Sequence, residues 1–303
     1  MLTIVNIFGN FLDNSGLSLV YQIPVAATSI LLATFGLYLL SQILTSYFSK
    51  RTSLLAAITL FSTTNLLFYV AVEPLTSHAI SFFSAALFIY YFLRYKKGNN
   101  YYFILGLLAG VSGLVRVLNS FLVIIPAIQI LSSSKHNLTH KLKLELKLAL
   151  GYLIGFLPQI YIWKLFFNKF IIGPSWGYGF DFGNPHITHV LFNSQNGLFT
   201  LTPIILFAIL GMIFFWKRNK SLAFYGLLYF ALHLFLVSSW AEFTQGGSYS
   251  IRMLINTYPL LAFGFAEIVE RVENAIGRNK TVAVILGLSA LNATLIIRYL
   301  ALY

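Results

Sequence analysis

Tyr69-Val-Ala-Val-Glu-Pro-Leu-Thr-Ser-His-Ala-Ile-Ser-Phe-Phe83 joins two apolar runs, 53–72 and 79–92, through only a few polar residues. The connection holds a carboxylate at Glu73 and an imidazole at His78. Ionisable groups beside membrane-length segments are costly and often mark a functional site. The same stretch is equally typical of a solvated turn before a helix that begins with Glu-Pro, because proline fits the first helical turn.

The composition is that of a polytopic membrane protein. Of the 303 residues, 58% are hydrophobic, 17% are aromatic and only 9% are charged, a balance foreign to soluble domains. Repeated apolar runs of roughly 17–25 residues predict transmembrane helices. Because the chain has no cysteine, it has no disulfide framework, thiolate metal site or cysteine nucleophile.

We expect an all-α fold: a single transmembrane domain over 1–303, with about ten spans and a long outer loop around 170–197. Residues 1–21 are expected to form an outer-side N-terminal stretch. The short runs 101–116 and 119–133 predict a tight hairpin with Arg116 and Asn119 at its apex. The ten spans are predicted at 20–46, 53–72, 79–94, 101–116, 119–133, 146–168, 198–216, 221–240, 252–270 and 281–298.

Basic residues predict the orientation of the bundle. Fifteen of the 20 Lys and Arg fall in alternate connections, which the positive-inside rule places in the cytoplasm. The net charge of +12 therefore reports topology and does not indicate a nucleic-acid partner. These residues are Lys50, Arg51, Arg94, Lys96, Lys97, Lys135, Lys141, Lys143, Lys147, Lys217, Arg218, Lys220, Arg271, Arg278 and Lys280.

The opposite side gathers polar groups from connections that are far apart in sequence. It holds four of the eight acids, namely Asp13, Glu73, Asp181 and Glu242. A set of this kind on one membrane face is typical of a composite site, although outer loops must also be polar for solvation alone.

The outer segment 171–192 is unusually long for a connection in a compact protein. Its alternating aromatics, among them Trp176, Tyr178 and Phe180, suit a sugar or a polyprenyl chain. His186 and His189 are three residues apart, which favours one face of an interfacial helix over a metal pair, since no third ligand is fixed by the spacing.

Two outer-side arginines border apolar segments. Arg116 ends one, and Arg252 follows Gly246-Gly-Ser-Tyr-Ser and opens another. A guanidinium in such a place can hold a phosphate with a fork of donors, and glycines let backbone amides approach an anion. The alternative is an arginine that reaches to lipid phosphates or pairs with Glu73 or Glu242.

Four motifs, in this order along most of the chain, resemble the GT-C superfamily of integral-membrane glycosyltransferases, closest to the mannosyl- and aminoarabinose-transferase type. Each motif alone is loose, and their order carries the likeness. They are Asn65-Leu-Leu-Phe-Tyr-Val with Glu73-Pro and Ser77-His-Ala-Ile-Ser-Phe-Phe; Leu105-Gly-Leu-Leu-Ala-Gly-Val-Ser-Gly-Leu-Val-Arg116; Asn196-Gly-Leu-Phe-Thr-Leu-Thr-Pro203; and Trp240 with Gly246-Gly-Ser-Tyr-Ser-Ile-Arg252 and Pro259.

The resemblance implies transfer of a sugar from a polyprenyl-phosphate donor to a glycan, lipid or protein acceptor, on the outer face of a prokaryotic inner membrane. Glu73 would take the acceptor proton with His78 beside it, and Arg252 and then Arg116 would hold the phosphate. Further substrate contacts are expected from Asn119, Asp181 and Glu242. No definite cofactor is implied, and a divalent metal is compatible with the site.

The N-terminus departs from the family pattern. Such enzymes begin with an outward helix and a large outer loop that carries a catalytic Asp or an Asp/Glu pair. This sequence is expected to start within or after that loop, and Asp13 is not equated with the catalytic residue. One alternative is a transporter or lipid flippase with Glu73, Arg116 and Arg252 along its path. Another is a non-catalytic fragment that binds lipid-linked sugar.

Overall fold

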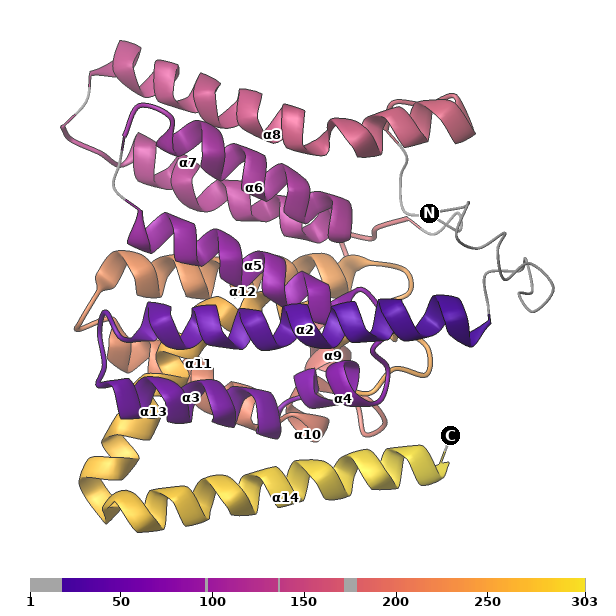
Figure 1. Ribbon diagram of the computed structural model, residues 1–303, viewed down its shortest axis with the longest axis vertical. Helices are drawn as coiled ribbons and strands as arrows, with labels where there is room; N and C mark the ends of the chain where they lie inside the picture. Colours follow the sequence, from indigo (N-terminus) through magenta and orange to yellow (C-terminus); the bar gives the residue numbers. More distant parts are fainter. Residues whose placement is uncertain (1–17, 96–97, 136, 172–178, 303) are drawn as a thin grey trace.

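The helices of the chain run side by side along one direction (Figure 1). The structure, a computed structural model, describes residues 18–95, 98–135, 137–171 and 179–302. Within these ranges the elements are helical, and extended pairing is limited to one bridge between Phe180 and Trp240. The predicted all-α fold is therefore confirmed. Asp13, Trp176 and Tyr178 lie outside the described residues.

Four helices are long and apolar enough to cross a membrane: α2 (Leu19–Leu44), α8 (Leu138–Phe167), α12 (Lys220–Ser239) and α14 (Arg278–Leu302). In Figure 1, α8 and α14 lie at the two edges of the bundle. Most of the side chains of α2, α8 and α14 are not buried within the protein. Apolar side chains exposed in this way suit contact with lipid.

Other predicted spans are interrupted, so the described helices do not confirm the count of ten. The run 53–72 divides into α3 (Lys50–Thr63) and α4 (Leu66–Ala71). The break occurs because Thr64 is extended and its hydroxyl accepts from the backbone amide of Leu66, as a helix-capping side chain does.

Three further predicted spans are divided or begin as 3-10 segments. The run 198–216 divides into α10 (Leu198–Leu201) and α11 (Ile204–Phe215), because Pro203 has no amide hydrogen to continue the helical ladder. The runs 119–133 and 252–270 begin as the 3-10 segments η1 (Val117–Val123) and η2 (Arg252–Thr257). The other elements are α5 (His78–Arg94), α6 (Tyr101–Val115), α7 (Ile124–Leu131), α9 (Ile187–Phe192) and α13 (Tyr258–Ile276).

Helices α6 and α8 touch backbone to backbone. A Cβ atom added to Gly106 would lie 2.0 Å from a backbone oxygen of α8, and one added to Gly151 would lie 2.0 Å from a backbone oxygen of α6. Gly110 and Gly155 repeat the contact one turn later. This is the small-residue spacing with which membrane helices approach closely, and it fixes α8 against α6 along its length.

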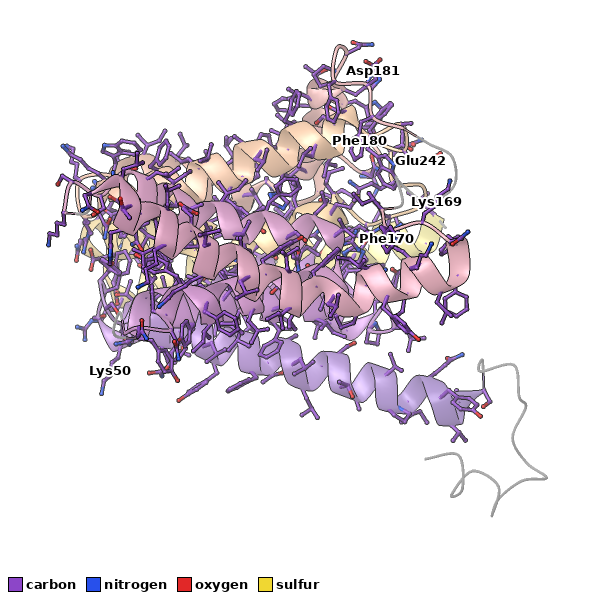
Figure 2. All side chains as sticks on the ribbon, turned by 90° about the horizontal axis from the view of Figure 1, so that it is seen from above. Lys50, Lys169, Phe170, Phe180, Asp181 and Glu242 are labelled. Carbon is purple, nitrogen blue, oxygen red and sulfur yellow. The ribbon has the colours of Figure 1, made fainter. Side chains whose placement is uncertain are left out.

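The bundle has two chemically different ends. Figure 2 shows Lys50 at one end and Phe180, Asp181 and Glu242 at the other. We call these the basic end and the site end. At the basic end, glutamates of α13 pair with arginines from other segments: Arg218 lies 2.7 Å from Glu267, and Arg51 of α3 lies 2.9 Å from Glu273.

Candidate functional site

A cavity of about 660 Å³, which we call the site cavity, opens between α6, η1, α8 and α12. Among the described residues that line it, Arg116 is the only charged one. The cavity is therefore an apolar chamber with a single cation in its wall. The lining residues are Ser77, Gly113, Leu114, Val115, Arg116, Val117, Leu118, Gln159, Trp163, Phe167, Phe180, Leu236, Val237, Trp240 and Met253.

Arg116 stands at the turn between α6 and η1, outside both helices. Its Nη1 donates to Ser77 Oγ at 3.2 Å and lies 3.3 Å from Nδ1 and 3.4 Å from Nε2 of His78. Burial lowers the pKa of Arg116 to about 10, and the nearby charge of Arg252 acts in the same direction. The guanidinium is thus held at the cavity wall in surroundings that oppose its charge.

Arg252 opens η2 at the same end of the bundle. Its Nη2 donates to the backbone oxygen of Gln245 at 3.4 Å, and its main chain is a hydrogen-bond partner of the His78 ring. His78 is buried and contacts both residues, the side chain of Arg116 and the main chain of Arg252. Within the described ranges neither Arg116 nor Arg252 forms an ion pair, although their charges act on each other.

Tyr69 connects the loop of Glu73 with the loop of Arg252. Its hydroxyl donates to the backbone oxygen of Tyr249 at 3.2 Å, and its ring lies 4.8 Å from the His78 ring between centroids. The charges of Glu73 and Arg252 both act on this hydroxyl. The structure thus brings Glu73, His78, Arg116 and Arg252 into one electrostatic neighbourhood, although neither Glu73 nor Arg252 lines the site cavity.

Asn119 is fully buried and lies in a polar network rather than at the cavity wall. Its Oδ1 accepts from Ser81 at 3.0 Å and from Asn256 Nδ2 at 2.9 Å. The Nδ2 of Asn256 also lies 2.9 Å from Nε2 of His233. Since Asn119 belongs to η1 and Asn256 to η2, this network ties together the two segments that follow Arg116 and Arg252.

Asp181 and Glu242 flank the bridge between Phe180 and Trp240, and neither of them lines the site cavity. Asp181 is exposed, and its Oδ1 accepts from the backbone amides of the two residues 183 and 184. The bridge itself brings two aromatic lining residues together. The indole Nε1 of Trp240 is buried and has no hydrogen-bond partner among the described residues.

His186 and His189 pack against a common aromatic side chain. Their rings lie 3.9 Å and 5.0 Å from the Phe243 ring between centroids, and α9 begins at Ile187. Within the described ranges no three His, Asp or Glu side chains are placed to share a metal ion. Use of a divalent metal stays a prediction.

Sequence reasoning overlooked the α8 wall of the cavity. Gln159, Trp163 and Phe167 recur every four residues, which places them on one helical face, and all three line the cavity. A lone glutamine within an apolar run, followed one turn later by tryptophan, was the available signal. Tyr69 carried no comparable signal, because its partner Tyr249 lies far away in sequence.

Comparisons with known proteins relate part of the chain to one family. The model of the dolichyl-phosphate-mannose-protein mannosyltransferase family matches residues 15–163. The matched segment contains Glu73, His78, Arg116 and Asn119, and it ends at the cavity residue Trp163. No curated protein and no solved structure matches the chain. The family match confirms the resemblance carried by the motifs: over residues 15–163 the chain is similar to the integral-membrane glycosyltransferases of the GT-C type.

Proposed function

We propose that the chain transfers a sugar from a polyprenyl-phosphate donor to a hydroxyl-bearing glycan, lipid or protein at the site end of the bundle. The membrane would be a prokaryotic inner membrane, with the site end outside and the basic end in the cytoplasm, in agreement with the positive-inside rule. Ten crossings would then be made, six of them by the shorter or interrupted helices.

The observation that carries the proposal is the relation between Arg116 and Arg252. Two guanidinium groups repel each other, both charges act on His78, and within the described ranges no carboxylate pairs with either of them. Such an arrangement is unfavourable until an anion enters between them. A phosphate diester suits it, since each guanidinium offers a planar fork of donors to phosphate oxygens.

The rest of the cavity suits the remainder of such a donor. Apolar side chains from α6 and α8, such as Leu114 and Trp163, offer walls for an isoprenoid chain. The unpartnered indole N–H of Trp240 offers a donor to a sugar hydroxyl or a phosphate oxygen. Because Arg116 lines the cavity and Arg252 does not, Arg116 would be the first phosphate ligand and Arg252 the second.

In the proposed reaction an acceptor oxygen forms a bond to the anomeric carbon of the sugar while the bond from that carbon to the phosphate oxygen breaks. Polyprenyl phosphate leaves with the electron pair of that bond, and the two arginines stabilise its charge. Glu73 takes the proton of the acceptor hydroxyl. His78 would act by orienting Arg116, which its ring nitrogens contact. Asp181 and Glu242 would meet the acceptor from the loops beside Trp240.

Binding of undecaprenyl phosphate to the purified full-length chain in uncharged detergent tests this function. We expect Arg116→Gln to weaken binding about ten- to hundredfold, the effect of losing a charge-assisted contact of about 1.5–3 kcal/mol. Arg298→Gln is the matched control, because Arg298 is an exposed arginine in the last turns of α14 and does not line the cavity. Unchanged binding by a folded Arg116→Gln variant would refute the proposed phosphate site.

A further inference from the structure

A second cavity, of about 640 Å³, lies at the basic end between α6, α7, α8 and α12. We call it the basic-end cavity. Its lining is polar and basic, in contrast to the apolar site cavity at the other end. The lining residues are Gly98, Asn99, Tyr102, Gln129, Ser132, Ser133, Lys135, His140, Lys143, Leu144, Lys147, Ser221 and Tyr225.

Helix α8 presents one face to this cavity. His140, Lys143, Leu144 and Lys147 follow the spacing of zero, three, four and seven residues that aligns side chains along one side of a helix. Two of the three lysines at the cavity therefore come from successive turns of α8. Lys135 adds a third cation from the connection that follows α7.

Several arginines at the basic end are neutralised by ion pairs with glutamates, whereas the three lysines at the cavity are not. Each ion pair between described residues joins an arginine to a glutamate of α13, and none includes a lysine. The described lining of the cavity contains no carboxylate. The basic end thus has an arginine-rich part that is internally paired and a lysine-rich hollow that is not.

Several other groups at the cavity can donate hydrogen bonds. Tyr102 and Tyr225 are both buried, and Tyr102 Oη donates a hydrogen bond of 3.4 Å to Gln129 Oε1. Lys147 Nζ donates to the backbone oxygen of Asn99 at 2.8 Å, which holds the connection after α5 against α8 as a wall. Ammonium and hydroxyl groups around a hollow of this size suit a phosphate oxyanion with a polar substituent.

We propose that the basic-end cavity binds a phosphate ester, either the headgroup of an anionic phospholipid or a soluble phosphate monoester. Both present oxygens that only accept hydrogen bonds and a negative charge that Lys135 and Lys143 would balance. This site is separate from the proposed donor site, because it lies at the opposite end of the bundle and shares no lining residue with the site cavity.

Two arms of one experiment distinguish the sources of the phosphate. In the first, glycerol 3-phosphate is titrated calorimetrically into the purified full-length chain in uncharged detergent. In the second, the chain is placed in phosphatidylcholine nanodiscs with or without phosphatidylglycerol, and native mass spectrometry counts the phosphatidylglycerol that remains bound. Binding in the first arm identifies a soluble ester, and retention in the second identifies a lipid headgroup.

The double variant Lys135→Gln/Lys143→Gln tests the residues. We expect it to weaken binding of the active probe about ten- to hundredfold, the effect of losing charge-assisted contacts. Lys50→Gln/Lys217→Gln removes the same charge from the same end without touching the cavity lining, and we expect less than about a twofold effect. Equal losses in both double variants, or no binding of either probe, would overturn the proposal.

Discussion

Asn256 Nδ2 donates a hydrogen bond of 2.9 Å to Asn119 Oδ1, and through it the segment that follows Arg116 is tied to the segment that follows Arg252. Both side chains are buried, and the bond joins positions 137 residues apart in sequence. The two arginines therefore depend on a shared interior contact for their relative placement, and not only on their own side-chain contacts.

The first prediction concerns this contact. Asn256→Ala should lower the free energy of unfolding by about 1–3 kcal/mol, because it leaves buried polar groups without a partner. It should also weaken undecaprenyl phosphate binding, because the spacing of the two arginines changes. Tyr101→Phe is the control: it removes a buried hydrogen bond of 2.6 Å to Phe92 at the other end of α6, so it should lower stability without changing binding. Equal binding by both variants would show that Asn256 is structural only.

The second prediction concerns the cost of placing a charge at Arg116. Its pKa in the folded state, about 10, lies below the ordinary arginine value. The folded state therefore holds this proton less tightly than the unfolded state, and the charge opposes folding at every pH below about 10. Arg116→Met should raise the melting temperature by about 2 °C or more while phosphate binding is lost. A lower melting temperature would show that the contacts to Ser77 and His78 outweigh the cost.

How far the sequence predicts the fold depends on the range of the interactions involved. Apolar runs are local signals, so α2, α14, the C-terminal end of α8 and the turn at Arg116 follow from the sequence to within a few residues. The start of α8 does not, because the helix begins at Leu138, in a charged segment before the predicted span at 146. The break at Thr64 was not predicted, although the polar residues Ser62-Thr63-Thr64-Asn65 stand inside the run, because the hydrogen bond from the Leu66 amide to the Thr64 hydroxyl is visible only in the structure.

In the candidate site, too, local features of the sequence were predictable and contacts between distant segments were not. Glu73, His78, Arg116 and Arg252 stand out because ionisable residues are rare in this chain, and the structure gathers them. The sequence does not predict that Arg116 lines the cavity whereas Arg252 does not, because this depends on how α6 lies against α8. That packing is set by the close approach of Gly106 to the backbone of α8 and of Gly151 to the backbone of α6, which no periodicity along one segment reveals.

The third prediction tests the orientation of the bundle. The chain lacks cysteine, so single substitutions give unambiguous labelling sites. Ser132 and Ser194 are both exposed and belong to the basic end and the site end, respectively. Ser194→Cys should react with a membrane-impermeant thiol reagent in intact cells, and Ser132→Cys only after the membrane is opened. Reaction of both variants in intact cells would contradict the proposed topology.

The fourth prediction concerns the contact that fixes the cavity walls. Gly106→Ala should destabilise the chain by about 1–3 kcal/mol, because the new methyl group would meet a backbone oxygen of α8 that cannot move alone. Gly287→Ala on α14 is the control, since nothing lies within 4 Å of its added Cβ and alanine favours the helix. Thermal unfolding in detergent should therefore shift in opposite directions, and equal shifts would argue against tight packing of α6 on α8.

The fifth prediction separates a phosphate ligand from a membrane anchor at Arg252. The arginine follows three residues with positive φ, Gln245, Gly246 and Ser250, and the side-chain hydrogen bond that it makes within the described ranges, to the backbone oxygen of Gln245, is a long one of 3.4 Å. Arg252→Ala should weaken undecaprenyl phosphate binding about tenfold, and Arg252→Lys should recover part of the loss, because an ammonium offers a point charge where a guanidinium offers a planar fork. Arg298→Ala, at an exposed arginine of the same end, should leave the affinity unchanged. If Arg252→Ala binds like the unmodified chain while Arg116→Gln does not, the phosphate is held by Arg116 alone, and the charge of Arg252 serves only to repel its neighbour.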